Sequence, residues 1–163
     1  MELAKVQQQR GHSPQAFDAL KQLYKAAPQS LPLAAGLLVT IAQQSDLTGP
    51  VLDLLQSHYK RAPSIDVMDA IASLEPDADT ARQRFATHLE GEASLVAASR
   101  WISSEKADPD PNHQLVIHAL AKATKPLMRY RCAACGFEAT QHFWHCPGCQ
   151  AWDSYPARRI EEL

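Results

Sequence analysis

The chain has no cysteine before position 132, no long apolar run and no large excess of charge of either sign. The richest apolar stretch, Leu31 to Ala42, is interrupted by Pro32, Gly36 and Thr40. It falls short of the roughly 20 residues that a membrane-spanning helix needs. With a net charge of −2, the chain has no basic field that would attract nucleic acid or an anionic membrane. The first 25 residues hold no secretory signal, which argues against disulfides formed in an oxidising compartment.

The motifs of common enzymes are also absent. The sequence contains no Gly-x-Ser-x-Gly, no His-Glu-x-x-His and no phosphate-binding loop. The histidines before the cysteines are scattered, at His12, His58, His88, His113 and His118. We interpret them as surface or half-buried helical residues, and we expect no catalytic activity.

Residues 1–125 have the apolar spacing of successive short helices. One helical face carries Ala16, Leu20, Leu23, Tyr24 and Ala27, and a second carries Val51, Leu54, Leu55, His58 and Tyr59. Further helices are predicted over Asp77–Glu90, Glu92–Ser104 and Asn112–Thr124, with a helix-breaking linker at 108–111. The expected N-caps are Ser13, Ser30, Ser64, Asp77 and Asn112.

An internal repeat is visible in this helical part. The sequence Tyr-Lys-Ala-Ala-Pro at 24–28 recurs as Tyr-Lys-Arg-Ala-Pro at 59–63, an offset of 35 residues. Helix pairs with this period and ending resemble the tetratricopeptide repeat. Ala4 and Ala16 occupy its small-residue positions, whereas Leu20 stands where an aromatic residue is usual. An irregular helical bundle remains the alternative. Because the first helix begins within the repeat pattern, we expect an N-terminally truncated array with more repeats upstream.

All four cysteines lie near the C-terminus, in two pairs, as Cys132-x-x-Cys135 and Cys146-x-x-Cys149. In each pair a tight turn directs two sulfurs at one point, and two such knuckles complete a tetrahedral thiolate site. Gly136 can adopt the positive φ that the first turn needs, and Pro147 and Gly148 are turn residues within the second. The sequence therefore predicts a metal site made of these four sulfurs.

Other uses of the cysteines are less consistent with the pattern. A thioredoxin-type pair starts a helix after a strand, whereas these pairs lie in a short aromatic segment. His142 and His145 are further candidate ligands, but His145 adjoins Cys146 and is expected to point away from the metal. We predict a closed, structural Zn²⁺ site, and iron remains possible because it accepts the same four thiolates.

The segment 128–157 holds six of the eleven aromatic residues, Tyr130, Phe137, Phe143, Trp144, Trp152 and Tyr155. The knuckles resemble those of rubredoxin, with a shorter loop between them, which favours a zinc ribbon. We expect the rings to fill a small core around the metal. The short connection through Lys125 and Pro126 predicts that the ribbon docks on the helices, with Trp144 or Trp152 as the bridge. Residues 158–163 are predicted to be a mobile tail or a partner contact.

Tetratricopeptide-like helices followed by Tyr-Arg-Cys-x-x-Cys-Gly-Phe at 130–137 and Trp-His-Cys-Pro-x-Cys-x-Ala-Trp at 144–152 resemble the C-terminal part of the lipopolysaccharide assembly protein B family. The resemblance implies a mainly α fold, with a helical-hairpin solenoid over 1–125 and a docked rubredoxin-like zinc ribbon over 128–157. It implies the four cysteines as metal ligands and no catalytic residue.

The same resemblance implies a function. Family members are adaptors at the cytoplasmic face of the inner membrane in Gram-negative bacteria, held by an N-terminal anchor that this sequence does not show. They limit lipid A synthesis by promoting degradation of its committing deacetylase through the membrane protease FtsH. The alternatives are an iron electron-transfer protein or a nucleic-acid-binding ribbon. The second is disfavoured because residues 132–157 contain no lysine or arginine to meet phosphates.

Overall fold

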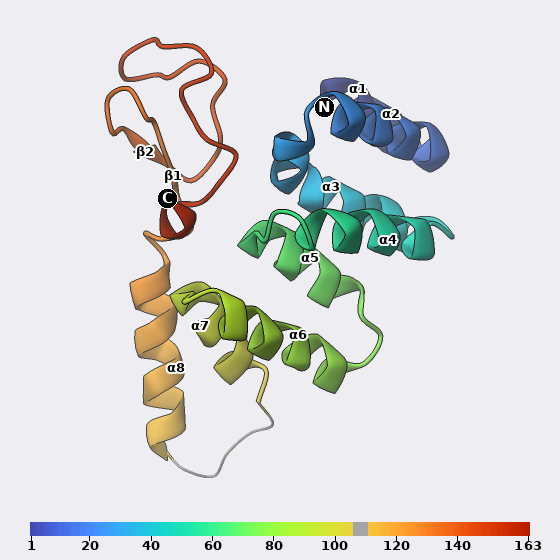
Figure 1. The fold of residues 1–163 in the computed structure, drawn as a ribbon. Coiled ribbons are helices and arrows are strands. Elements are labelled where there is room, and N and C mark those ends of the chain that lie inside the picture. The colour runs from blue at the N-terminus through green and yellow to red at the C-terminus, as the bar shows by residue number, and fades with distance from the viewer. Residues whose placement is uncertain (106–110) are drawn as a thin grey trace. The chain divides into compact units, whose positions relative to one another are not determined.

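The chain is mainly helical, and its C-terminal part contains a small two-stranded sheet (Figure 1). The computed structural model describes residues 1–105 and 111–163, so positions 108–110 of the predicted linker lie outside the described residues. The chain divides into two compact units, Met1–Pro76 and Asp77–Leu163. Within the described residues, no helix combines the length and the apolar character needed to cross a membrane. The predicted fold class, a mainly α chain of helical hairpins with a C-terminal ribbon, is confirmed.

The first unit is a series of helices in which neighbours along the chain pack together. Its elements are α1 (Glu2–Gln9), α2 (Ser13–Ala26), η1 (Pro28–Ser30), α3 (Leu31–Gln43), α4 (Thr48–Tyr59) and α5 (Ile65–Leu74). Helix α1 packs against α2, α3 packs against α4, and both α3 and α4 pack against α5. Consecutive helices therefore pack against each other, α2 on α3 included, and α5 covers the pair α3 and α4, as in a stack of helical hairpins.

The core of this unit is formed by the apolar residues that the helical spacing selects. Its fully buried large side chains include Leu20, Leu38, Ile41, Val51 and Leu55. The predicted small-residue positions are buried as well, with Ala4 at 1% and Ala16 at 0% exposure. Small side chains there let α1 and α2 approach closely.

The two copies of the internal repeat lie at corresponding places in the helices. The first copy begins in the last turn of α2, and the second begins at the final residue of α4. The copies also contact each other, because the Arg61 guanidinium lies over the Tyr24 ring and donates a hydrogen bond to its hydroxyl. The Tyr24 ring meets the buried His58 ring edge to face, with 5.7 Å between their centroids.

The predicted N-caps are realised unevenly. Asp77 caps its helix, since its carboxylate accepts a hydrogen bond from the Thr80 N–H at 2.8 Å. Ser30 and Ser64 occupy the N-cap positions of α3 and α5, but neither side chain makes the cap hydrogen bond. Ser13 and Asn112 lie inside their helices, which begin at Ser13 and Pro111, so both predictions are wrong by one residue or two. Proline is tolerated in the first turn of a helix because its missing N–H would have no intrahelical partner there, so α2 starts one residue before Pro14 and α8 starts at Pro111.

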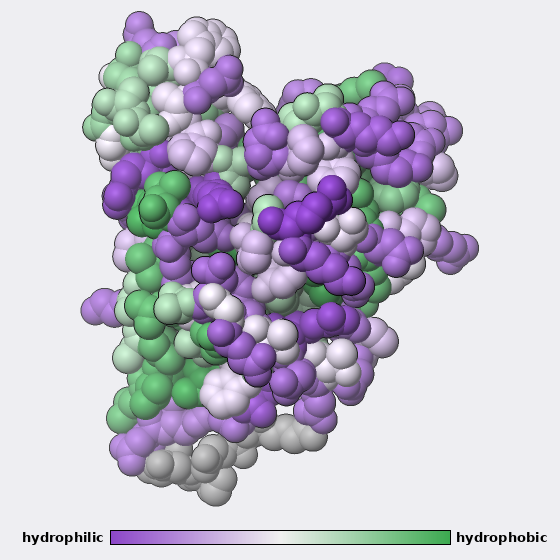
Figure 2. All heavy atoms as spheres, in the orientation of Figure 1, coloured by the Kyte–Doolittle hydropathy of each residue, from purple (hydrophilic) through white to green (hydrophobic). Residues whose placement is uncertain are grey.

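The second unit combines three described helices with the metal-binding segment. Its elements are α6 (Ala78–Gly91), α7 (Leu95–Ser103), α8 (Pro111–Thr124), β1 (Tyr130–Arg131), β2 (Glu138–Ala139) and η2 (Ile160–Glu162). Helix α7 packs against both α6 and α8. Helix α8 exposes apolar side chains, including Leu115 at 65% and Val116 at 46%, and Figure 2 shows a hydrophobic strip along it. Its apolar surface is only partly covered by α7.

The C-terminal residues are ordered against the rest of this unit. Strands β1 and β2 pair antiparallel, with Tyr130 opposite Ala139. The Glu161 carboxylate accepts hydrogen bonds from the Val96 N–H at 2.9 Å and the Ser94 hydroxyl at 2.8 Å, at the start of α7. The prediction of a mobile tail is therefore wrong for this part. The first N–H groups of a helix lack intrahelical partners and attract a carboxylate, wherever in the sequence it comes from.

Candidate metal centre

Each cysteine pair lies in a turn with the same backbone hydrogen bonds. In the first turn the Gly136 N–H donates to the Cys132 carbonyl and the Cys132 N–H donates to the Phe137 carbonyl, each at 2.9 Å. In the second turn the Gln150 and Cys146 N–H groups make the corresponding bonds, to the carbonyls of Cys146 and Ala151, also at 2.9 Å. The two knuckles are thus copies of one local structure, 14 residues apart.

The residue that follows each pair has a left-handed backbone. Gly136 has φ +77°, as the sequence predicts, and Gln150 takes the same role with φ +61°. Only the glycine could be foreseen, because a glutamine gives no local signal for this conformation. The second knuckle therefore keeps its shape at the expense of backbone strain, which its hydrogen bonds and the metal site offset.

A pair of glycine substitutions tests the backbone requirement of the first knuckle. No atom lies within 4 Å of a Cβ added at Gly136 or at Gly36, so neither alanine would clash. Gly136→Ala should destabilise the metal segment by about 1–2 kcal/mol because of its positive φ. Gly36→Ala, in the middle of α3, should instead stabilise the first unit by about 0.5–1 kcal/mol. Denaturant unfolding of both variants measures the sign of the change in the free energy of unfolding. A Gly136→Ala variant as stable as the wild type would contradict the strain argument.

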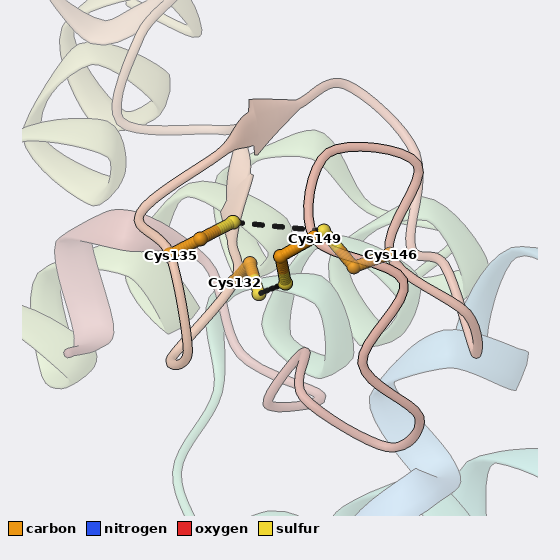
Figure 3. Close-up of side chains that lie close together, drawn as sticks. All are labelled: Cys132, Cys135, Cys146 and Cys149. Atoms are coloured by element: carbon orange, nitrogen blue, oxygen red, sulfur yellow. Dashed lines mark hydrogen bonds between the residues drawn. The ribbon is translucent and has the colours of Figure 1, made fainter.

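The four sulfurs converge on one point, as the sequence predicts. Their Sγ atoms all lie within 4.8 Å of one another, and Figure 3 shows the two knuckles facing each other. Cys132 Sγ lies 3.8 Å from Cys149 Sγ, and Cys135 Sγ lies 3.7 Å from Cys146 Sγ. A disulfide would need about 2.05 Å. A tetrahedron with metal–sulfur bonds of about 2.3 Å has edges of about 3.8 Å, so these residues fit a four-coordinate metal.

Hydrogen bonds favour the thiolate form of the first cysteine of each knuckle. These two residues, Cys132 and Cys146, are buried, and we call them the inner cysteines. The hydrogen bond with Ser154 lowers the pKa of the Cys132 thiol to about 6, and the N–H groups of Cys135 and Ala134 act in the same direction. Burial opposes ionisation of Cys146, but the N–H groups of Cys149 and Gly148 outweigh it and lower its pKa. Both inner sulfurs are therefore prepared to bind a cation as thiolates.

The outer cysteines are in a different environment. Cys135 and Cys149 are exposed, whereas Cys132 and Cys146 are buried. The Phe137 N–H favours the Cys135 thiolate, but the neighbouring sulfurs of Cys149, Cys132 and Cys146, with the partial loss of water around this sulfur, raise the pKa of the thiol to about 12. Four sulfurs so close cannot all ionise without a cation among them, and a bound metal removes that repulsion.

Two residues that the motif did not include support the site. Ser154 Oγ lies 3.2 Å from Cys132 Sγ, and the Ser154 carbonyl accepts a hydrogen bond from the Ala133 N–H at 2.7 Å. The Tyr155 hydroxyl donates to the Phe137 carbonyl at 3.1 Å, and its oxygen lies 4.0 Å from Cys146 Sγ. Burial, followed by the influence of Cys146, raises the pKa of this phenol to about 12. Residues after the second knuckle thus fold back over both inner sulfurs.

The two histidines have other partners. His142 Nε2 lies 3.0 Å from the Tyr155 carbonyl, and burial lowers the pKa of this imidazole. His145 stacks on Trp152, with 4.7 Å between the ring centroids. The sulfur cluster therefore consists of the four cysteines, which leaves a four-coordinate metal no open position for water or substrate.

The aromatic residues are divided between the interior and the surface of the segment. Tyr130 and Tyr155 are each 5% exposed and form its small core. Trp144 is 49% exposed and meets the His142 ring, while Trp152 is 72% exposed. The predicted tryptophan bridge to the helices is wrong for Trp152, because a side chain so exposed is not packed between two elements. Glu161, bound at the start of α7, makes the connection that the structure shows.

Comparison with known proteins identifies this segment. Residues 130–155 match the rubredoxin metal binding domain of lipopolysaccharide assembly protein B. The C-terminal resemblance to that protein is confirmed. The chain is 50% identical over 36 residues to lipopolysaccharide assembly protein B of three Escherichia coli strains, K12, O6:H1 and O157:H7. The aligned stretch covers 22% of this chain and 9% of each relative, so it describes the metal segment and not the helices.

Proposed function

We propose that this chain is a non-catalytic, protein-binding adaptor that acts in lipopolysaccharide assembly. The observation that carries the proposal is the 50% identity to lipopolysaccharide assembly protein B, in a segment whose four cysteines form a metal site. A metal held by four sulfurs has no free position at which to activate water or a substrate. The site therefore serves to hold the segment folded.

The helical part supports a protein-binding role. Stacked helical hairpins present long surfaces that suit peptide or helical partners. Exposed Leu115 and Val116 on α8 add apolar area of the kind that marks interaction sites. We interpret the first unit as tetratricopeptide-like, since its repeat has a period of 35 residues and its hairpins stack.

The partners that we propose are the membrane protease FtsH and the deacetylase that commits precursor to lipid A. In this proposal the adaptor works at the cytoplasmic face of the inner membrane and promotes proteolysis of the deacetylase. The resemblance of the metal segment supports this pathway.

Zinc is the metal that we propose for the site. Four thiolates form a closed structural zinc site, and the loop between the knuckles is shorter than in electron-transfer rubredoxins. The alternative metal is iron. Elemental analysis with an absorption spectrum distinguishes iron from zinc, because iron thiolates are coloured and zinc thiolates are not. One zinc per chain would support the structural role. One iron per chain that can be reversibly reduced would instead indicate an electron-transfer role.

Complementation tests the function. In an Escherichia coli strain lacking lipopolysaccharide assembly protein B, a chimera carrying this chain as its C-terminal part should restore low deacetylase levels. The same chimera with Cys146→Ser and Cys149→Ser should not, whereas Ala133→Ser, an exposed change in the first knuckle, should behave as wild type. If the intact chimera left deacetylase levels unchanged, the lipopolysaccharide proposal would fall. An active double mutant would show that the metal site is dispensable.

A further inference from the structure

The last residues of the chain form a compact turn, which we call the C-terminal clasp, residues 159–162. The turn closes on itself, since the Arg159 N–H donates to the Glu162 carboxylate at 2.9 Å. Its sequence combines a cation, an apolar residue and two carboxylates, so it can meet carbonyls, a ring and N–H groups at once. The structure uses all three kinds of contact.

One side of the clasp holds the connection that leads into the first knuckle. The Ile160 N–H donates to the Arg129 carbonyl at 2.8 Å, and the Arg159 guanidinium donates to the Met128 carbonyl at 2.6 Å. The same guanidinium lies 4.1 Å from the centroid of the Tyr130 ring, a distance typical of a cation–π contact. Tyr130 is 5% exposed and stands two residues before Cys132.

The other side of the clasp caps a helix. The two oxygens of Glu161 accept hydrogen bonds from the Val96 N–H and from the Ser94 hydroxyl, and the Ser94 hydroxyl oxygen accepts one from the Ala97 N–H at 2.9 Å. In a capping box the carboxylate comes from the third residue of the helix itself. Here that position is Ala97, and the carboxylate comes from the chain end, 65 residues after Val96.

Two stretches of chain connect the clasp with the sulfur cluster. The clasp contacts residues 128–130, which lead directly to Cys132. The second stretch, residues 149–158, leads from Cys149 to the clasp through Tyr155, whose hydroxyl lies beside Cys146. The segment between them has little apolar core besides its rings, so metal binding supplies most of its folding free energy. When the metal leaves, residues 149–158 lose the anchor from which they present the clasp. On the other side, the turn in which the Leu127 and Met128 N–H groups donate to the Thr124 carbonyl still joins the chain to α8, but Tyr130 loses its place beside the first knuckle.

We propose that the C-terminal clasp couples metal occupancy to helix α7: metal bound at the four cysteines holds Glu161 on the first turn of α7, and metal loss releases it. Release leaves the Val96 N–H without its partner and lets the first turn of the helix open. The metal segment thereby controls the order of a helix that contributes no ligand to it. This inference depends on metal binding and not on the lipopolysaccharide role.

Amide hydrogen exchange on the full chain tests the coupling at single residues. Removing the metal with a chelator should speed exchange at Val96 about tenfold, the loss expected when a helix cap is removed. Glu161→Ala should have the same effect with the metal still bound. Thr80, whose N–H is capped by Asp77 within its own helix, should not change in either experiment. Glu90→Ala, an exposed glutamate on α6, is the matched control.

Each outcome distinguishes one step of the proposal. If Glu161→Ala left Val96 exchange unchanged, the carboxylate would not cap the helix and the clasp would be refuted. If Glu161→Ala speeded exchange but metal removal did not, the cap would be real and the coupling to the metal would be wrong. Metal content measured on the same samples shows separately whether the site was loaded, so a failure of metal binding cannot be mistaken for a failure of the clasp.

Discussion

Cys146→Ser is expected to abolish stable metal binding and to unfold residues 128–157, while the first unit keeps its helices. Cys146 is 0% exposed, and its sulfur lies 3.7 Å from that of Cys135 and beside the Tyr155 hydroxyl. Structural zinc contributes about 10–16 kcal/mol in small metal-dependent domains. Losing one thiolate therefore removes more free energy than a segment of this size can replace.

Metal content and amide exchange together measure this result. The metal-to-protein ratio should fall toward zero, and protection of the Cys132 N–H, which bonds the Phe137 carbonyl, should be lost. Ala133→Ser introduces the same hydroxyl at an exposed position in the neighbouring knuckle and should retain both signals. A Cys146→Ser protein with stoichiometric metal and a protected Cys132 amide would show that this sulfur is not needed.

The sequence predicts features that are determined by near neighbours. The cysteine knuckles are such features, because two cysteines three residues apart and a following Gly136 define the turn within six residues. The helices follow from apolar spacing, and the predicted helix over Asp77–Glu90 differs from α6 by one residue at each end. In each case the decisive interactions lie within one or two turns of chain.

The features that were missed depend on residues far apart in sequence. Glu161 finds its partners at Ser94 and Val96, more than 60 residues away, and no local pattern joins them. Ser154 reaches Cys132 only because the second knuckle returns the chain over the first. Ser64 has a good N-cap residue type, yet its buried hydroxyl makes no hydrogen bond among the described residues. Packing of the chain, rather than residue preference, decides these contacts.

Leu38→Ala is expected to destabilise the first unit by about 3–4 kcal/mol, a large share of the stability of a small domain. Leu38 lies in α3, is 0% exposed and belongs to the cluster of buried side chains that joins the helices of this unit. Helix α3 packs against α2, α4 and α5, so a cavity here removes contacts from several helices at once.

Leu3→Ala is the matched control, because Leu3 lies in a helix of the same unit but is 64% exposed. It should lower the free energy of unfolding by less than about 0.5 kcal/mol.

Far-ultraviolet circular dichroism in urea follows the unfolding of the helices. Tryptophan fluorescence follows only the second unit, since Trp101, Trp144 and Trp152 all come after Pro76. Leu38→Ala should lower the dichroism midpoint and leave the metal content unchanged. Equal midpoints for the two variants would mean that the stacked hairpins do not share the core described here. Loss of metal in Leu38→Ala would mean that the first unit helps to fold the metal segment.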